Sequence, residues 1–158
     1  MTDNYIGIMI ESLRRKKDVL TDILKLSEEQ SLLLDDPNLE PDTFEKNVNR
    51  KAALIDKLEQ LDTGFESLYE KVKEELESNR DIHKEQIKQM QELIRALTEL
   101  NMQIQATEAR NKEKATAKFA YIRQQAKEIR SSQKIVKEYY NNMMHKAYNE
   151  PHFLDNKK

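Results

Sequence analysis

Apolar residues recur at steps of three and four positions along most of this chain, and one stretch in its interior interrupts them strongly. Such steps place side chains on one face of an α-helix, whereas a strand needs alternation. The 158 residues include only two Gly and three Pro, so the chain has few means of making tight turns. The sequence therefore predicts an all-α protein of long amphipathic helices that pack as a coiled-coil-like bundle.

The first helix is expected to begin after Asp3, which can cap it, and to end near Leu34. The strong interruption follows at residues 35–41, where two prolines each remove a backbone donor and disfavour helix in the residue before them. The sequence thus predicts an N-terminal antiparallel helical hairpin over residues 3–78. The apolar stripe of its first helix consists of Ile6, Ile10, Leu13, Leu20, Ile23, Leu24 and Leu34.

The second helix is expected to start at once, because Asp42 and Glu45 have the spacing of a capping box with Asp42 at the cap. Gly64 lies inside this helix and costs about 1 kcal/mol relative to alanine. The stripe of the second helix consists of Val48, Ile55, Leu58, Phe65, Tyr69, Val72 and Leu76, with Leu54, Leu61 and Leu68 beside it.

The stripe turns polar around Asn79, with His83 and Gln86 also at positions where apolar residues are expected. Either the helix continues through this region or residues 78–81 form a short break. The break is favoured because Ser, Asn and Asp all compete for backbone donors at helix starts. Beyond it the stripe resumes with Met90, Leu93, Leu97, Leu100 and Ile104.

Residues 105–114 contain two alanines as their only apolar residues but no Gly or Pro, so helix can continue there without an apolar face. A break within this stretch is the alternative. The step from Ile104 to Ala115 spans eleven residues, a stutter in the heptad that rotates the apolar face. The last stripe then consists of Ala115, Phe119, Ile122, Ala126, Ile129, Val136, Tyr140 and Met143.

These elements predict a single elongated helical domain over residues 1–148, followed by a flexible tail at 149–158 after Pro151. The C-terminal helical region is expected over residues 81–148, and an uninterrupted helix of that length would span roughly 100 Å. Part of it must therefore fold back on the hairpin, dimerise or stand free.

The C-terminal stripe is the candidate partner-binding site. An amphipathic helix of this kind can take a partner helix, and its aromatic and Met side chains suit interfaces with varied partners. The alternative is that the stripe packs on the hairpin as ordinary bundle core. The candidate site residues are Phe119, Ile122, Ile129, Val136, Tyr140 and Met143.

Residues with catalytic or metal-binding potential do not form a recognisable motif. There is no Cys, and His83, His145 and His152 lie far apart without a metal-binding pattern. No phosphate loop or nucleophile motif occurs. The sequence therefore predicts no enzyme activity, no cofactor and no metal. It contains no signal peptide and no apolar run of about 20 residues, so we expect a cytoplasmic protein without membrane insertion.

The net charge of −2 conceals an uneven distribution, because residues 110–146 hold ten Lys/Arg and three Asp/Glu. A basic segment can bind nucleic acid or an anionic membrane, but it can equally pair with the acidic helices of its own chain or of a partner. We do not expect nucleic-acid binding.

The hairpin resembles the FlgN type of flagellar type III export chaperone. Three stretches carry the resemblance: Glu-Glu-Gln-Ser-Leu-Leu-Leu at 28–34, the acidic linker at 35–42, and Lys-Ala-Ala-Leu-Ile-Asp-Lys-Leu-Glu-Gln-Leu-Asp at 51–62. The resemblance covers about 70 residues well and the rest by general character. Residues 103–112 depart from the family pattern, and the sequence gives no account of them beyond a polar, hinge-capable stretch.

The resemblance implies a cytosolic chaperone that binds hook-associated proteins, prevents their premature assembly and delivers them to the type III export apparatus. In that family the C-terminal helical region binds the client, which matches the candidate stripe. A structural coiled coil that acts as a homodimeric scaffold is an alternative. A FliT-type chaperone of the filament cap is another, because small helical export chaperones have similar sequences.

Overall fold

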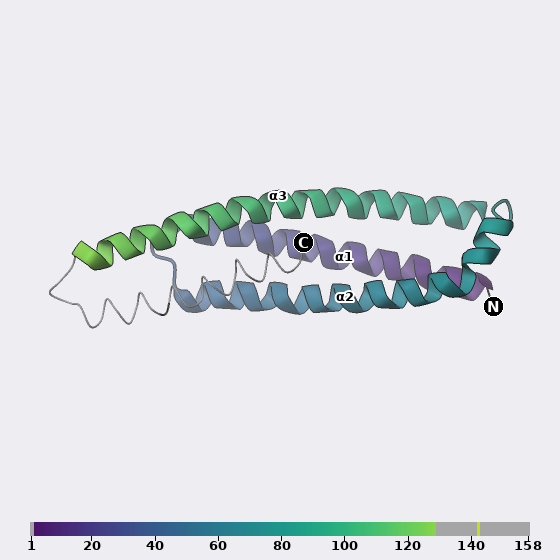
Figure 1. Ribbon diagram of the computed structural model, residues 1–158, viewed down its shortest axis with the longest axis horizontal. Coiled ribbons are helices and arrows are strands. Elements are labelled where there is room, and N and C mark those ends of the chain that lie inside the picture. Colours follow the sequence, from purple (N-terminus) through teal and green to yellow (C-terminus); the bar gives the residue numbers. More distant parts are fainter. Residues whose placement is uncertain (1, 129–141, 143–158) are drawn as a thin grey trace. The chain divides into compact units, whose positions relative to one another are not determined.

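The structure, a computed structural model, describes residues 2–128 and residue 142 (Figure 1). Within these residues it contains three long α-helices and no strand: α1 Thr2–Asp35, α2 Pro41–Ser78 and α3 Lys84–Glu128. The all-α prediction is confirmed. Ile129, Val136, Tyr140, Met143, His145 and His152, together with the expected tail, lie outside the described residues.

The first turn is short and is held by local hydrogen bonds. The Asp36 carboxylate accepts the N–H of Asn38 at 2.8 Å, and the Asp36 carbonyl accepts the N–H of Leu39 at 3.3 Å. Proline suits the first position of a helix because its fixed φ is already helical and its missing N–H needs no partner there. Helix α2 therefore begins at Pro41, so Asp42 lies in the first turn and the prediction that it is the cap residue is wrong.

The second turn occupies residues 79–83, and the predicted break near Asn79 is confirmed. The N–H of Asn79 still bonds to the carbonyl of Glu75 at 2.9 Å, which closes α2, and the carbonyl of His83 accepts the N–H of Ile87 at 2.9 Å, which opens α3. The His83 side chain is 5% exposed, and its Nε2 lies 3.4 Å from a carboxylate oxygen of Glu75. His83 thus links the two helix ends across the turn.

The chain divides into two compact units, each made from parts of all three helices. Among the described residues, the first unit comprises residues 2–25 and 52–104, and the second comprises residues 26–51 and 105–128. In the second unit the short turn at residues 36–40 reverses the chain, so α1 and α2 run antiparallel there, and Lys51 donates to Gln30. In the first unit Lys16 of α1 pairs with Asp62 of α2. Helix α3 runs parallel to α1 in the second unit, where Ser27 contacts Glu108 and Ser31 contacts Lys114.

The core of the first unit is apolar and is richest on α1. Between Ile55 and Val72, by contrast, no residue of α2 is buried, and the predicted stripe residue Tyr69 is 39% exposed. The side chains along this part of α2 are therefore loosely covered. The buried apolar residues of the unit are Ile6, Met9, Ile10, Leu13, Val19, Leu20, Ile23, Ile55, Val72, Leu76, Met90 and Leu97.

Candidate functional site

A layer of buried polar side chains crosses the second unit. On each helix the layer occupies positions that continue the apolar stripe: Ser27 and Gln30 lie between Ile23 and Leu34 at helical steps, and the other two helices repeat the pattern. A polar residue at a core position is costly unless its partners are brought to the same level. The buried members are Ser27 and Gln30 of α1, Asn47 and Lys51 of α2, and Thr107 and Asn111 of α3, and each is at most 5% exposed.

An ion pair between Lys51 and Glu108 lies at the centre of this polar layer. The Lys51 ammonium is 2.6 Å from the Glu108 carboxylate and donates to the Gln30 side-chain oxygen at 3.0 Å. The Ser27 hydroxyl donates to the same Glu108 oxygen at 2.5 Å. The Lys51 side chain is 1% exposed and that of Glu108 is 13% exposed, so the pair has lost most of its hydration. The pair thus ties α1, α2 and α3 together through charge rather than apolar contact.

Two amides extend the polar layer to the backbone of α1. The Asn111 amide donates to the Ser27 carbonyl at 2.8 Å and to the Gln30 side-chain oxygen at 3.1 Å. The Asn47 amide donates to the Leu26 carbonyl at 2.9 Å. These bonds fix the level at which the three helices meet, because a shift of one turn would move every donor away from its acceptor.

The hydrogen bonding of the polar layer is incomplete among the described residues. Four of its buried atoms have no partner there: Gln30 Nε2, Asn47 Oδ1, Glu108 Oε2 and Asn111 Oδ1. A buried polar group without a partner costs about 1–3 kcal/mol relative to its hydrated form. The polar layer therefore specifies how α3 sits on the hairpin while adding less stability than an apolar layer of the same size.

A small apolar cluster lies next to the polar layer, at the end of the hairpin. Leu34, Leu39 and Phe44 supply the hairpin side, and Ala115 and Phe119 supply the α3 side. All five are at most 5% exposed, and Leu33, Val48 and Ile122 are partly buried against them.

The rim of this cluster is charged. Lys114 donates to a carboxylate oxygen of Asp35 at 2.9 Å and to the Ser31 hydroxyl at 2.8 Å, and Lys118 donates to the Asp36 carbonyl at 2.6 Å. The Lys114 and Asp35 side chains are 33% and 57% exposed, so this pair adds little stability. These two lysines of the basic segment thus bind the acidic turn of their own chain.

Of the six candidate partner-binding residues, the structure describes two. Phe119 is 3% exposed within the apolar cluster, and Ile122 is partly buried against that cluster. Both therefore contact the hairpin in this conformation. The assignment of all six residues to partner binding stays a prediction.

The polar layer is the feature that the periodicity of the sequence missed. Residues 105–114 are predicted to lack an apolar face, and the residues of this stretch that are buried, Thr107 and Asn111, are indeed polar. They lie at helical steps between Ile104 and the buried Ala115. The stretches 28–34 and 51–62, which carry the resemblance to the export chaperones, include Gln30 and Lys51 of the layer. The sequence does contain a sign of the polar layer, because in all three helices polar residues occupy positions at helical steps within the apolar stripe.

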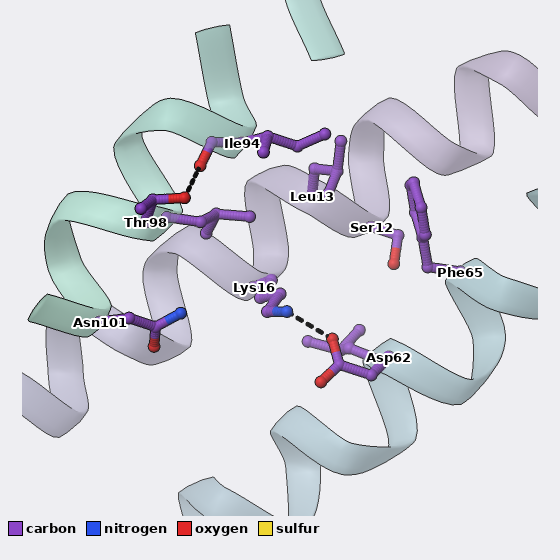
Figure 2. Close-up of a pocket in the computed structure, with 10 residues that line it drawn as sticks. Ser12, Leu13, Lys16, Asp62, Phe65, Ile94, Thr98 and Asn101 are labelled. Carbon is purple, nitrogen blue, oxygen red and sulfur yellow. Dashed lines mark hydrogen bonds and ion pairs between the residues drawn. The ribbon is translucent and has the colours of Figure 1, made fainter. Parts of the chain in front are cut away.

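The first unit contains a hollow of about 220 Å³ between its three helices (Figure 2). Lys16 and Asp62 form an ion pair of 2.6 Å at its edge, and Leu13 and Leu97 are its buried apolar members. Phe65 lines the hollow from the loosely covered part of α2. The hollow reflects this incomplete packing, and no titratable cluster surrounds it. The lining residues are Ser12, Leu13, Lys16, Leu61, Asp62, Phe65, Ile94, Leu97, Thr98 and Asn101.

Within the described part of the chain, no three His, Asp or Glu side chains are grouped so that they could hold a metal ion. None of the described helices has the length and apolarity that crossing a membrane requires.

Comparison with known protein families gives a match over most of the chain. The family model described as FlgN protein matches residues 1–144, which includes all three helices. Neither a curated protein nor a solved structure matches the chain. The matched region covers most of the sequence and contains the polar layer and the apolar cluster of the second unit. The chain therefore belongs to the FlgN family of flagellar export chaperones, a family of chaperones rather than enzymes.

Proposed function

We propose that this protein binds hook-associated flagellar proteins in the cytoplasm, keeps them from assembling early and delivers them to the type III export apparatus. Membership of the FlgN family over residues 1–144 is the observation that carries the proposal. The physical logic agrees, because a polymerising client segment with an exposed apolar helical face can be shielded in a shared helical bundle.

The candidate stripe of Phe119, Ile122, Ile129, Val136, Tyr140 and Met143 is proposed as the surface that the client contacts. Its spacing places these residues on one face of a helix, as in helix-in-groove recognition. The neighbouring basic residues favour a client with acidic residues beside its apolar face.

The first experiment is a co-purification of the tagged protein from the cytosol of a flagellated host, with partners identified by mass and the complex sized in solution. We expect a hook-associated protein at equimolar ratio. Recovery of the filament-cap protein instead would indicate the FliT-type client class. Recovery of the protein alone as a tight, elongated dimer would replace the chaperone proposal with a structural coiled coil.

A double substitution tests the surface itself. Ile129→Asp with Val136→Asp should abolish client binding while helicity measured by circular dichroism stays near that of the parent. Ser131→Asp, a change that the same helical spacing places on the opposite side of the segment, is the matched control and should bind normally. If the double variant unfolds, the stripe is bundle core and the site assignment is wrong.

A further inference from the structure

We propose that the hairpin end in the second unit is itself a docking surface for a client helix, which takes the place that α3 occupies in the closed conformation. This hairpin-end surface consists of Gln30, Leu34, Leu39, Phe44 and Lys51, which are buried with residues of α3: the three apolar residues cluster with Ala115 and Phe119, Gln30 contacts Asn111, and Lys51 pairs with Glu108. The inference rests on the proposed function and adds a second binding surface to it, with a defined partner chemistry.

The need for opening follows from the burial of Phe119. Phe119 is a candidate client-binding residue, yet it is 3% exposed against Leu34 and Phe44 of the hairpin. A client can contact it only after the end of α3 leaves the hairpin. When α3 leaves, the hairpin-end surface is uncovered as well, and its apolar residues then need a partner.

The polar layer makes this opening easier than the separation of an apolar core. Gln30 Nε2, Asn47 Oδ1, Glu108 Oε2 and Asn111 Oδ1 are buried without partners among the described residues when α3 is in place. Glu108 and Asn111 belong to α3, and Gln30 is contacted by Asn111, so their unpaired atoms become accessible to water when α3 departs. The open state thus regains interactions that the closed state lacks. The rim contacts of Lys114 are partly exposed and also weak.

Lys51 determines what kind of helix can replace α3. Its ammonium is 1% exposed and lies 2.6 Å from the Glu108 carboxylate. A partner that buried Lys51 without supplying a carboxylate would leave an uncompensated charge, which is strongly unfavourable. The incoming helix must therefore carry an Asp or Glu at the level of Lys51.

The other residues that the incoming helix must carry can be inferred from the α3 residues that contact the hairpin-end surface. Ala115 and Phe119 lie seven and eleven residues beyond Glu108 and fill the apolar cluster. Lys114 and Lys118 lie six and ten residues beyond Glu108 and bind at Asp35 and Asp36. The fitting partner is thus an amphipathic helix with a carboxylate, a small apolar residue seven positions later, an aromatic residue eleven positions later, and lysines on the adjacent face.

Opening can be measured without a client, because the chain contains no Cys and single thiols can be introduced. Ala115→Cys places a thiol under the closed α3, and Val72→Cys is the matched control in the first unit; the parent residues are 2% and 1% exposed. Under native conditions we expect a thiol reagent to modify Ala115→Cys about tenfold faster than Val72→Cys, because only the former is reached by local opening. Equal rates would overturn the inference.

Docking is tested by holding α3 closed. In the Ser31→Cys/Lys114→Cys variant, the two positions whose parent side chains meet at 2.8 Å are joined with a short bis-methanethiosulfonate cross-linker, which forms a disulfide with each cysteine, releases two sulfinates and can be removed by reduction. The linked chain should bind a purified hook-associated protein about tenfold or more weakly than the unlinked chain, and reduction should restore binding. Lys16→Cys/Asp62→Cys, linked in the same way within the first unit, is the control and should bind like the parent.

The outcomes separate the two proposals. If the linked and unlinked chains bind equally well, docking at the hairpin-end surface is wrong while the proposed function stands. If the parent chain binds no hook-associated protein, the proposed function fails and docking fails with it, and the labelling rates still report whether the second unit opens.

Lys51→Met combined with Glu108→Leu should keep the unit closed and weaken client binding, and unchanged binding would refute the role of Lys51.

Discussion

Replacing Lys51 by methionine tests how the buried ion pair contributes to the stability of the second unit. Methionine keeps most of the aliphatic volume of the side chain but removes its charge. The Glu108 carboxylate, 13% exposed, then retains only the Ser27 hydroxyl as its hydrogen-bond partner among the described residues. Breaking one side of a buried pair typically costs about 3–5 kcal/mol, and we expect a loss in the free energy of unfolding of that size.

The double variant Lys51→Met/Glu108→Leu should behave differently. It removes both charges together, so no buried charge is left without a partner. Replacing a buried pair by apolar residues is often neutral or stabilising by about 1–4 kcal/mol. The expected coupling between the two positions is therefore several kcal/mol, and a double-mutant cycle isolates it.

The matched control is the ion pair between Lys16 and Asp62. Its 2.6 Å separation equals that of the buried pair, but its side chains are 23% and 48% exposed. Lys16→Met should therefore lower stability by only about 0–1 kcal/mol. The comparison separates burial from distance as the source of the effect.

Urea unfolding followed by far-UV circular dichroism measures each free energy. Equal slopes with respect to urea across the variants would show that the same surface is exposed on unfolding, so the midpoints can be compared. If Lys51→Met loses no more than Lys16→Met, the polar layer is not closed in solution and the reasoning from burial is refuted.

Three further changes can be measured by the same unfolding assay. Phe119→Ala should lower stability by about 3–5 kcal/mol because the side chain is 3% exposed, whereas Tyr121→Ala, at a residue 62% exposed, should change it by less than about 0.5 kcal/mol; equal effects would contradict the placement of α3. Gly64→Ala should raise stability by about 0.5–1 kcal/mol, since the added methyl meets nothing within 4 Å, and a loss would show a contact that the structure lacks. Pro41→Ala should lower stability by about 0.4–1 kcal/mol by loosening the unfolded chain, and a gain would argue against a helical start at this residue.

Much of the fold can be predicted from the sequence, because the residues that start and end helices act on the backbone next to them. The prolines at 37 and 41 and the run of Ser, Asn and Asp at 78–81 predict both turns, and α1 ends one residue after Leu34. The cap of α2 was misplaced because Asp42 and Glu45 have capping-box spacing, while the neighbouring Pro41 is better suited to the first helical position. Helix starts are decided by such competition between adjacent residues.

The polar layer could not be predicted in the same way, because its stability depends on residues far apart in sequence. Thr107 and Asn111 look like the loss of an apolar face when α3 is considered alone. They become core residues only because α1 brings acceptors to the same level, with Asn111 bonding to Ser27 across 84 positions. The spacing of apolar and polar residues within one helix does not show which residues of another helix will lie opposite them in the fold.

The order of synthesis gives the buried ion pair a further consequence. Glu108 is synthesised 57 residues after Lys51. At a synthesis rate of about 5–20 residues per second, roughly 3–11 s therefore pass before the Lys51–Glu108 ion pair can form. During that interval the nascent hairpin presents an uncovered surface that is both apolar and cationic. We expect a client helix that carries a carboxylate at the level of Lys51, if it is translated nearby, to compete with the chain's own third helix for this position, so assembly with a client can begin before either protein is complete.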